Sequence, residues 1–190
     1  LKFLCLFGIT FSLLIITANA EELKENSWRY KNGIPIQTEE SDSNELYSFA
    51  TPTMKGIDVS KHQGVINWDS VYGNIDYAII RCGYGNDEWN QDDIKFVQNV
   101  NGCEDNGIQY GVYLYSYAVD NDKEKTLEDM ARSEAEHVLR MIEEAGAKPT
   151  MSVYYDIEDK SQVGMTTKQY GDMAEIFCNI VKNAGYNVGV

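Results

Sequence analysis

Two acidic residues at the end of one apolar run, Asp156 and Glu158, are the residues of this chain best suited to chemistry. They close the run Met151-Ser-Val-Tyr-Tyr-Asp-Ile-Glu158, whose composition predicts a buried strand. Side chains alternate between the faces of a strand, so residues two apart project from the same face. Two neighbouring carboxyl groups repel, and one tends to keep its proton near neutral pH. One carboxylic acid and one carboxylate are what acid-catalysed cleavage of a glycosidic bond requires.

A third acid, Asp58, lies near the end of another short apolar segment, Gly56-Ile-Asp-Val-Ser60. An aspartate at a strand end can also cap the next helix, because its carboxylate accepts hydrogen bonds from free N–H groups. That structural explanation fits Asp156 and Glu158 less well, because placing two acids on an apolar strand is costly. We therefore expect Asp58, Asp156 and Glu158 to form one catalytic set.

Four further residues are candidates for holding a substrate near these acids. Arg81 stands in a predicted strand and is expected to pair with one of the three carboxylates. Tyr84 lies in the loop after one predicted strand and Tyr117 at the C-terminal end of another, where their rings could stack on a sugar and their hydroxyls bond to it. Trp89, in a polar loop, is either a platform at the rim of a cleft or an exposed loop residue.

The remaining aromatic and histidine residues are expected to be structural. Tyr113 and Tyr115 alternate along a predicted strand and are expected mainly in the core, as is Trp68. His137 belongs to a charged helical segment and is expected to be solvated. Because His62 and His137 are too few and too scattered for a metal site or a catalytic triad, we predict neither a metal nor a cofactor.

The elements that must position these residues begin at Met54, where short apolar runs alternate with longer amphipathic ones. Strand–helix–strand repetition predicts parallel strands joined by right-handed crossovers. Acids at the C-terminal ends of strands favour a TIM-barrel-like α/β fold over an open sheet. Strands are expected at about 55–59, 77–82, 109–117, 152–157 and 187–190, with helices near 92–105, 123–145 and 167–184.

Residues 54–190 contain a set of short motifs in a specific order and spacing. These are Gly56-Ile-Asp-Val-Ser60 with Gln63-Gly64 and Trp68, Ala78-Ile-Ile-Arg-Cys-Gly-Tyr-Gly85, Gly111-Val-Tyr-Leu-Tyr-Ser-Tyr-Ala118, Tyr155-Asp-Ile-Glu158 and Ala184-Gly-Tyr186. With this set of motifs, the segment resembles glycoside hydrolase family 25, the lysozymes that cleave bacterial peptidoglycan.

The resemblance implies a flattened barrel of eight strands with fewer helices. It also implies hydrolysis of the β-1,4 bond between N-acetylmuramic acid and N-acetylglucosamine. By that likeness Glu158 would be the general acid, and Asp156 would stabilise the charge developing at the sugar or orient its acetamido group. Asp58 would tune the pair and hold the substrate. The family has a further acid near its C-terminal end, so a domain that stops at Val190 is expected to be incomplete.

Three alternatives to this activity remain open. A chitinase-like glycosidase would have another acid two residues before Asp156, where this chain has Tyr154. A magnesium-dependent phosphodiesterase could use the same three acids, although histidines are missing from the predicted strand ends. A non-catalytic peptidoglycan-binding paralogue is the third, and the presence of all three acids argues against it.

The N-terminal segment and the composition indicate where the chain acts. Residues 1–20 have one basic residue, a mostly apolar run shorter than a membrane span, and an Ala-Asn-Ala ending, which predicts a secretory signal peptide. Residues 21–53 are polar and aperiodic, which predicts a linker or N-terminal arm. We therefore expect a secreted protein, extracellular or associated with the cell wall, with no membrane attachment after cleavage.

The net charge of −14 argues against nucleic acids and anionic membranes as partners, and favours a neutral substrate held by hydrogen bonds and stacking. Three cysteines lie outside the signal peptide, and their spacing fits neither a disulfide framework nor a metal site. We expect free, buried thiols at Cys82, Cys103 and Cys178, with a Cys82–Cys103 bridge as the alternative.

Overall fold

The computed structural model of the chain describes residues 30–31, 34–35, 54–120 and 124–190. The chain divides into two units, Leu1–Tyr47 and Ser48–Val190. In the first unit, β1 (Tyr30–Lys31) and β2 (Ile34–Pro35) pair as a two-stranded antiparallel sheet.

Two predictions fall largely on residues that are not described. The predicted signal peptide at residues 1–20 lies wholly outside the described residues. The predicted arm at residues 21–53 also lies outside them, apart from the two short strands β1 and β2. Both therefore remain predictions.

The second unit is built on a five-stranded parallel sheet in which each strand lies beside its neighbour in sequence. Its strands are β3 (Gly56–Val59), β4 (Tyr77–Tyr84), β5 (Gln109–Tyr115), β6 (Val153–Asp156) and β7 (Val188–Gly189). Parallel strands in sequential order are the arrangement of a β/α barrel wall, which confirms the predicted fold class. The described residues contain five of the eight strands that a complete barrel would have.

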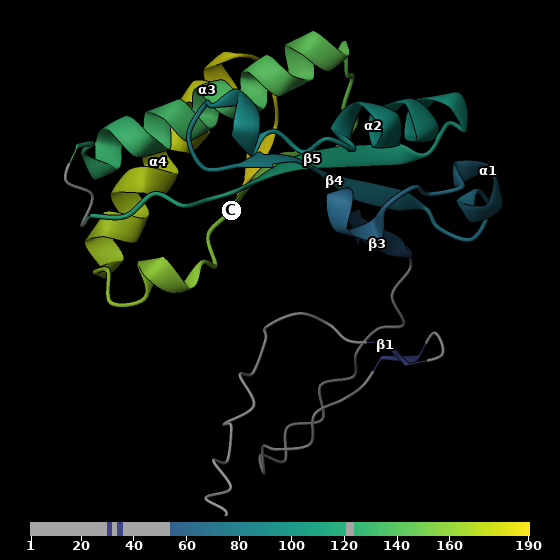
Figure 1. Ribbon diagram of the computed structural model, residues 1–190, viewed down its shortest axis with the longest axis horizontal. Coiled ribbons are helices and arrows are strands. Elements are labelled where there is room, and N and C mark those ends of the chain that lie inside the picture. Colours follow the sequence, from purple (N-terminus) through teal and green to yellow (C-terminus); the bar gives the residue numbers. More distant parts are fainter. Residues whose placement is uncertain (1–29, 32–33, 36–53, 121–123) are drawn as a thin grey trace, which may run out of the picture. The chain divides into compact units, whose positions relative to one another are not determined.

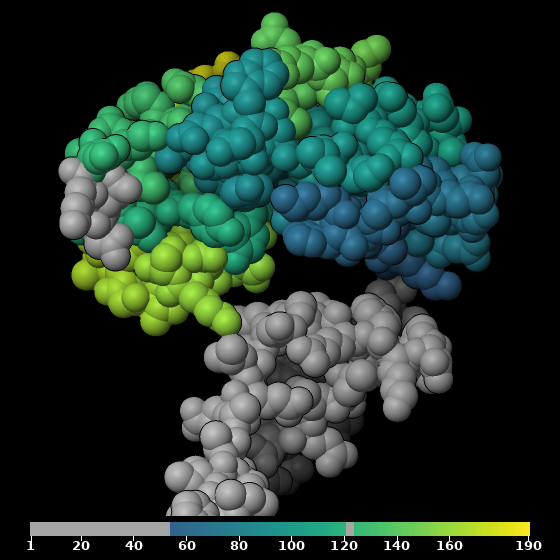
Figure 2. Space-filling model, in the orientation of Figure 1, coloured from purple at the N-terminus to yellow at the C-terminus, as the bar shows by residue number. Residues whose placement is uncertain are grey.

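The helices lie along one side of this sheet, with α2 and α3 beside β4 and β5, and with α4 packed against α3 (Figure 1). In Figure 2 the loop that follows β4 lies on the surface between α2 and α3. The α-helices are α1 (Trp68–Val71), α2 (Phe96–Asp105), α3 (Leu127–Ala145) and α4 (Thr167–Asn183). Within residues 54–120 and 124–190 there are also three single turns of 3₁₀ helix, η1 (Lys61–Gln63), η2 (Trp89–Gln91) and η3 (Lys160–Gln162).

Capping residues explain where the two long helices begin. Thr126 and Asp129 form a capping box at the start of α3, and Thr166 and Gln169 form another at the start of α4. The sequence predicted that this helix begins near Asp92, but α2 begins at Phe96. The backbone N–H of Asp93 donates a hydrogen bond to the carbonyl of Cys82 in β4, so residues 92 and 93 do not enter the helix.

The core lies between the helices and one face of the sheet. Every second residue of β4, β5 and β6 faces the helices and is buried, including Ile80, Val112 and Tyr155. The ring of Tyr155 stacks on Phe177 of α4 with ring centroids 4.0 Å apart. Burial of one such aromatic side chain contributes about 1.5–3 kcal/mol. Trp68 is also buried, as predicted.

The opposite face of the sheet carries polar and charged side chains. Asp58, Arg81, Tyr113, Tyr115 and Asp156 all occupy this face, since each is out of phase with the buried set. The prediction that Tyr113 and Tyr115 lie mainly in the core is therefore wrong. Both are only partly buried, and their rings stand on the same side as the acids.

The cysteine and membrane predictions have simple outcomes. Cys82 and Cys103 are free and buried, and Cys178 is free and partly buried, so the Cys82–Cys103 bridge is not formed. None of the helices in residues 54–120 and 124–190 combines the length and apolar character that crossing a bilayer requires.

Candidate active site

The three acids lie at the C-terminal ends of the strands. Asp58 belongs to β3, and Asp156 is the last residue of β6. Glu158 follows two residues later, exposed in the loop that leads to η3. The charges of Glu158 and Asp58 both raise the pKa of Asp156, so the fold brings the three carboxyl groups within electrostatic range of one another.

Asp156 is the acid whose titration is displaced furthest in this set. Burial raises the pKa of Asp156 to about 7, and the charges of Glu158 and Asp58 add to that effect. The guanidinium of Arg81 acts in the opposite direction. Asp156 therefore keeps its proton close to neutral pH.

Asp58 is held by a tyrosine, not by a helix N-terminus. The hydroxyl of Tyr113 donates a hydrogen bond of 3.0 Å to Asp58 Oδ1. Burial raises the pKa of Asp58, while the Tyr113 hydrogen bond and the charge of Arg81 partly oppose the rise. The N-cap of the following turn is Ser60, which forms a capping box with Gln63. Asp58 therefore does not cap a helix, which excludes the alternative structural role considered for it.

Arg81 does not pair directly with any of the three acids, so that prediction is wrong. Its Nε donates to Asp93 Oδ2 at 2.9 Å, and its Nη2 lies 2.8 Å from the same oxygen. Both side chains are buried, and a buried guanidinium needs a close counter-ion. Asp93 also accepts hydrogen bonds from the backbone N–H groups of Lys61 and Lys95. Arg81 thus acts on Asp58 and Asp156 through its charge.

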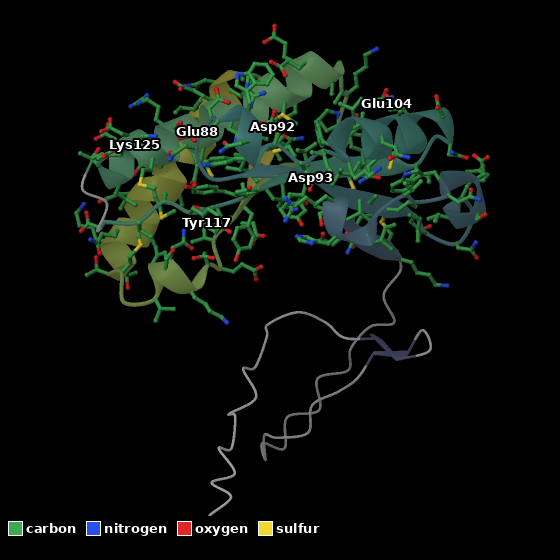
Figure 3. All side chains as sticks on the ribbon, in the orientation of Figure 1. Glu88, Asp92, Asp93, Glu104, Tyr117 and Lys125 are labelled. Atoms are coloured by element: carbon green, nitrogen blue, oxygen red, sulfur yellow. The ribbon has the colours of Figure 1, made fainter. Side chains whose placement is uncertain are left out.

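A groove of about 450 Å³ opens at the C-terminal ends of β3, β4 and β5. It contains three tyrosine rings in edge-to-face contact, with centroid distances of 5.5 Å for Tyr84–Tyr117 and 5.4 Å for Tyr115–Tyr117. Tyr117 lies just beyond the end of β5 and is 41% exposed (Figure 3). The residues that line the groove are Lys61, His62, Arg81, Tyr84, Tyr115 and Tyr117. The fold therefore brings Arg81, Tyr84 and Tyr117 together.

Trp89 lies outside this groove. It is 74% exposed in η2, and the guanidinium of Arg140 lies 4.6 Å from the centre of its ring. Such a stack leaves one ring face available to solvent. Contact of Trp89 with a substrate remains a prediction.

A buried acid that the sequence analysis missed lies behind the site. Glu134 of α3 is fully buried and accepts hydrogen bonds from Ser116 Oγ at 2.9 Å, Tyr155 OH at 2.5 Å and the backbone N–H of Tyr117 at 2.7 Å. Burial raises the pKa of Glu134, and these hydrogen bonds oppose the rise. Gln162 adds a bond to Ser116 Oγ at 3.0 Å. The network ties α3 to the ends of β5 and β6, next to Tyr117 and Asp156.

A signal for Glu134 was present in the sequence. Position 134 falls four residues after the apolar position 130 and three after the apolar position 131, within the inward-facing stripe of α3. An acid at such a position is buried with partners or not tolerated at all.

His137 is buried, so the prediction that it is solvated is wrong. Its Nδ1 lies 3.0 Å from the carbonyl oxygen of Gly85, and its Nε2 lies 2.9 Å from Asp92 Oδ1. Asp92 also pairs with Arg140 at 2.6 Å. A Cβ atom on Gly83 would meet the His137 ring at 2.6 Å, which explains a glycine there. His137 thus anchors the loop after β4 to α3.

In the part of the chain that the structure describes, no group of three or more His, Cys, Asp or Glu side chains is arranged to hold a metal ion. A second hollow of about 470 Å³ lies between the start of α3 and α4. None of the three acids or the groove residues lines it.

The match with Glycosyl hydrolases family 25 extends over residues 57–190, which contain all three acids. The chain belongs to this family. Its fold is also similar to solved structures. The modular autolysin LytC from Streptococcus pneumoniae is 26% identical with a TM-score of 0.59, and the comparison covers 85% of this chain and 36% of LytC.

Two more solved structures are similar to this chain in fold. LytC in complex with a synthetic peptidoglycan ligand is 25% identical with a TM-score of 0.60, again over 85% of this chain and 36% of that one. The Clostridium perfringens spore cortex lytic enzyme SleM is 16% identical with a TM-score of 0.61, over 73% of this chain and 44% of SleM, and supports the fold alone. This family member thus spans little more than a third of the length of LytC. No curated protein sequence matches the chain.

Proposed function

We propose that this protein is a secreted N-acetylmuramidase that hydrolyses the β-1,4 bond between N-acetylmuramic acid and N-acetylglucosamine in bacterial peptidoglycan. The observation that carries the proposal is the acid pair at the end of β6, in which the pKa of Asp156 is raised to about 7 beside Glu158. An acid pair of this kind supplies a proton donor and a carboxylate together. The similarity to LytC, solved with a synthetic peptidoglycan ligand, supports the substrate.

In the proposed reaction Glu158 delivers the proton to the departing oxygen. Glu158 is exposed on a loop, whereas Asp156 is partly buried at the strand end, so Glu158 is better placed to reach a glycosidic oxygen. The proton held by the pair passes through Glu158, which leaves Asp156 as the carboxylate facing the sugar. Asp156 then stabilises the positive charge developing on the ring or orients the acetamido group.

Arg81 and Tyr113 influence the charge and orientation of the acids. The positive charge of Arg81 partly offsets the rise in the pKa of Asp58 and of Asp156, and so opposes simultaneous protonation of both acids. The hydrogen bond from Tyr113 holds Asp58 in one orientation. The rings of Tyr84 and Tyr117 offer a surface on which a sugar stacks, close to the bond that is cleaved.

The proposed place of action follows from the substrate and the predicted signal peptide at residues 1–20. Peptidoglycan lies outside the cytoplasmic membrane, so the enzyme works after export, either free or in the wall. Nucleic acids and membranes are not part of the proposed function, because the chain has 30 acidic and only 16 basic residues.

The substitution Glu158→Gln tests this function in a peptidoglycan hydrolysis assay. It removes the proton donor and keeps the shape of the side chain, so hydrolysis should fall by about 10²–10⁴-fold. The matched control is Glu136→Gln, which changes an exposed acid of α3. Circular dichroism confirms that both variants fold. Undiminished hydrolysis by Glu158→Gln would refute the assignment. Binding of peptidoglycan without hydrolysis by the unmodified protein would instead favour a wall-binding paralogue.

A further inference from the structure

The groove beside the acids is lined in part by basic side chains, in contrast to the acidic chain as a whole. Three of its six lining residues, Lys61, His62 and Arg81, have basic side chains, although the complete sequence has a net charge of −14. The local electrostatic potential, not the total charge, decides which ligand groups a groove attracts. The expectation of a purely neutral substrate, based on composition, therefore needs to be refined for this groove.

The two cations have different local partners. The guanidinium of Arg81 is buried and neutralised by Asp93. The backbone N–H of Lys61 also bonds to Asp93, at 2.9 Å, which fixes the start of η1 beside the groove. In residues 54–120 and 124–190, no carboxylate forms an ion pair with the ammonium group of Lys61. Lys61 is thus a groove cation whose charge is still available to a ligand.

The position of the Lys61 ammonium is defined by an aromatic ring. Its Nζ lies 5.3 Å from the ring centroid of Tyr84, and Tyr84 makes the edge-to-face contact with Tyr117. A cation above a tyrosine ring is partly removed from water, which strengthens its attraction for an anion that enters the groove. A sugar that stacks on these tyrosines would bring its substituents next to the ammonium group.

Peptidoglycan offers an anion at a suitable place on its sugar. Each N-acetylmuramic acid carries a lactyl ether on its ring, and the lactyl carboxyl is either free or extended by a peptide that itself ends in carboxylates. A polymer of N-acetylglucosamine alone has no such group. A cation in the groove would therefore favour glycans with muramic acid over chitin-like glycans, because only the former gain an ion pair.

We propose that Lys61 is a specificity residue that binds a carboxylate of the muramic acid substituent while the sugar stacks on Tyr84 and Tyr117. This inference rests on the proposed function and specifies which part of peptidoglycan the groove recognises. Arg81 contributes by holding Asp93, and thereby η1, in place.

Binding measurements in a Glu158→Gln background test the inference without any cleavage. Three glycans of equal length serve as probes: a neutral N-acetylglucosamine tetrasaccharide, an alternating tetrasaccharide with free lactyl carboxylates, and the same tetrasaccharide with peptide stems. Lys61→Met removes the charge and keeps the chain length, and Lys61→Arg restores a charge. Lys182→Met, an exposed lysine in the last turn of α4, is the matched control.

Lys61→Met should weaken binding of the carboxylate-bearing glycans by about 5–10-fold and change the neutral glycan by less than about two-fold. Lys61→Arg should recover most of the loss, and added salt should shrink the difference. A loss limited to the free lactyl form identifies the lactyl group, and a loss limited to the stem form identifies the peptide. Equal effects on all three glycans, or none, would overturn the role of Lys61 alone. Absence of binding by every glycan to every variant would overturn the proposed function as well.

Discussion

Tyr113 and Asp58, which stand two strands apart in the sheet, are joined by a hydrogen bond of 3.0 Å from the tyrosine hydroxyl to the carboxylate. The bond spans β4 and links β5 to β3 on the face that carries the acids. Through it, one aromatic side chain fixes the orientation of an acid whose charge in turn raises the pKa of Asp156. The titration of the pair at β6 is therefore set in part by a contact made at β3.

Tyr113→Phe tests this contact. The substitution removes a hydrogen bond that lowers the pKa of Asp58, so that pKa should rise further. Peptidoglycan hydrolysis should fall by about 3–10-fold, the equivalent of one lost hydrogen bond, and the acidic limb of its pH profile, where Asp58 loses its proton, should move to higher pH. Tyr72→Phe, at a residue that is 61% exposed, is the control. If rate and pH profile are both unchanged, Tyr113 has no influence on the acids.

The raised pKa of Asp156 makes the stability of the fold depend on pH. The pKa is about 7 in the folded chain against an ordinary value of 3.8, so the folded chain binds this proton more tightly than the unfolded chain does. The resulting stabilisation is complete below about pH 4 and is lost as the pH rises through about 7.

Asp156→Asn removes this dependence because asparagine does not titrate. Between pH 4 and pH 7 the variant should gain stability relative to the unmodified protein, by about 1–2 kcal/mol after allowance for solvent screening of a partly exposed group. Urea denaturation at several pH values measures the difference. A stability difference that stays constant over this range would show that Asp156 is not perturbed.

The roles of the two acids can be separated with an aryl glycoside substrate. A phenolate leaving group departs without a proton, so Glu158→Gln should retain most of its activity on such a substrate while losing about 10²–10⁴-fold on peptidoglycan. Asp156→Asn should lose activity on both substrates, because charge stabilisation at the sugar is required in each case. The reverse pattern would make Asp156 the proton donor, in line with the raised pKa of its carboxyl group.

Glu134 should be important for stability, since three hydrogen-bond donors converge on its buried carboxyl group. Glu134→Gln places an NH₂ group where only acceptors fit, and should lower the free energy of unfolding by about 2–3 kcal/mol. Glu136→Gln, two residues away on the exposed side of α3, should have almost no effect. Equal midpoints of urea denaturation for the two variants would contradict the hydrogen-bond network described here.

The sequence was most informative where local pattern decides the structure. The apolar run before Asp156 predicts β6, and alternation with amphipathic segments predicts parallel strands joined by helices. Alternation also predicted the wrong environment for Tyr113, because a strand pattern does not reveal which of its two faces meets the helices. That choice is made by the packing of the whole sheet.

Contacts between residues that are far apart in the sequence could not be predicted, for the same physical reason. Arg81 was expected to bind a catalytic acid, but Asp93 is brought closer by the loop after β4. His137 was expected in water, yet α3 turns it toward Gly85 and Asp92. Such pairings depend on how separate elements come together, which composition and spacing do not encode in a single sequence.

The most direct test of the proposed activity is the identity of the new reducing ends in digested peptidoglycan. The digest is reduced with borohydride and hydrolysed, and the amino sugar alcohols are identified by mass spectrometry. Cleavage by the proposed mechanism should produce muramitol in amounts that rise with digestion, with none from Glu158→Gln. New glucosaminitol in place of muramitol would identify a glucosaminidase and contradict the account.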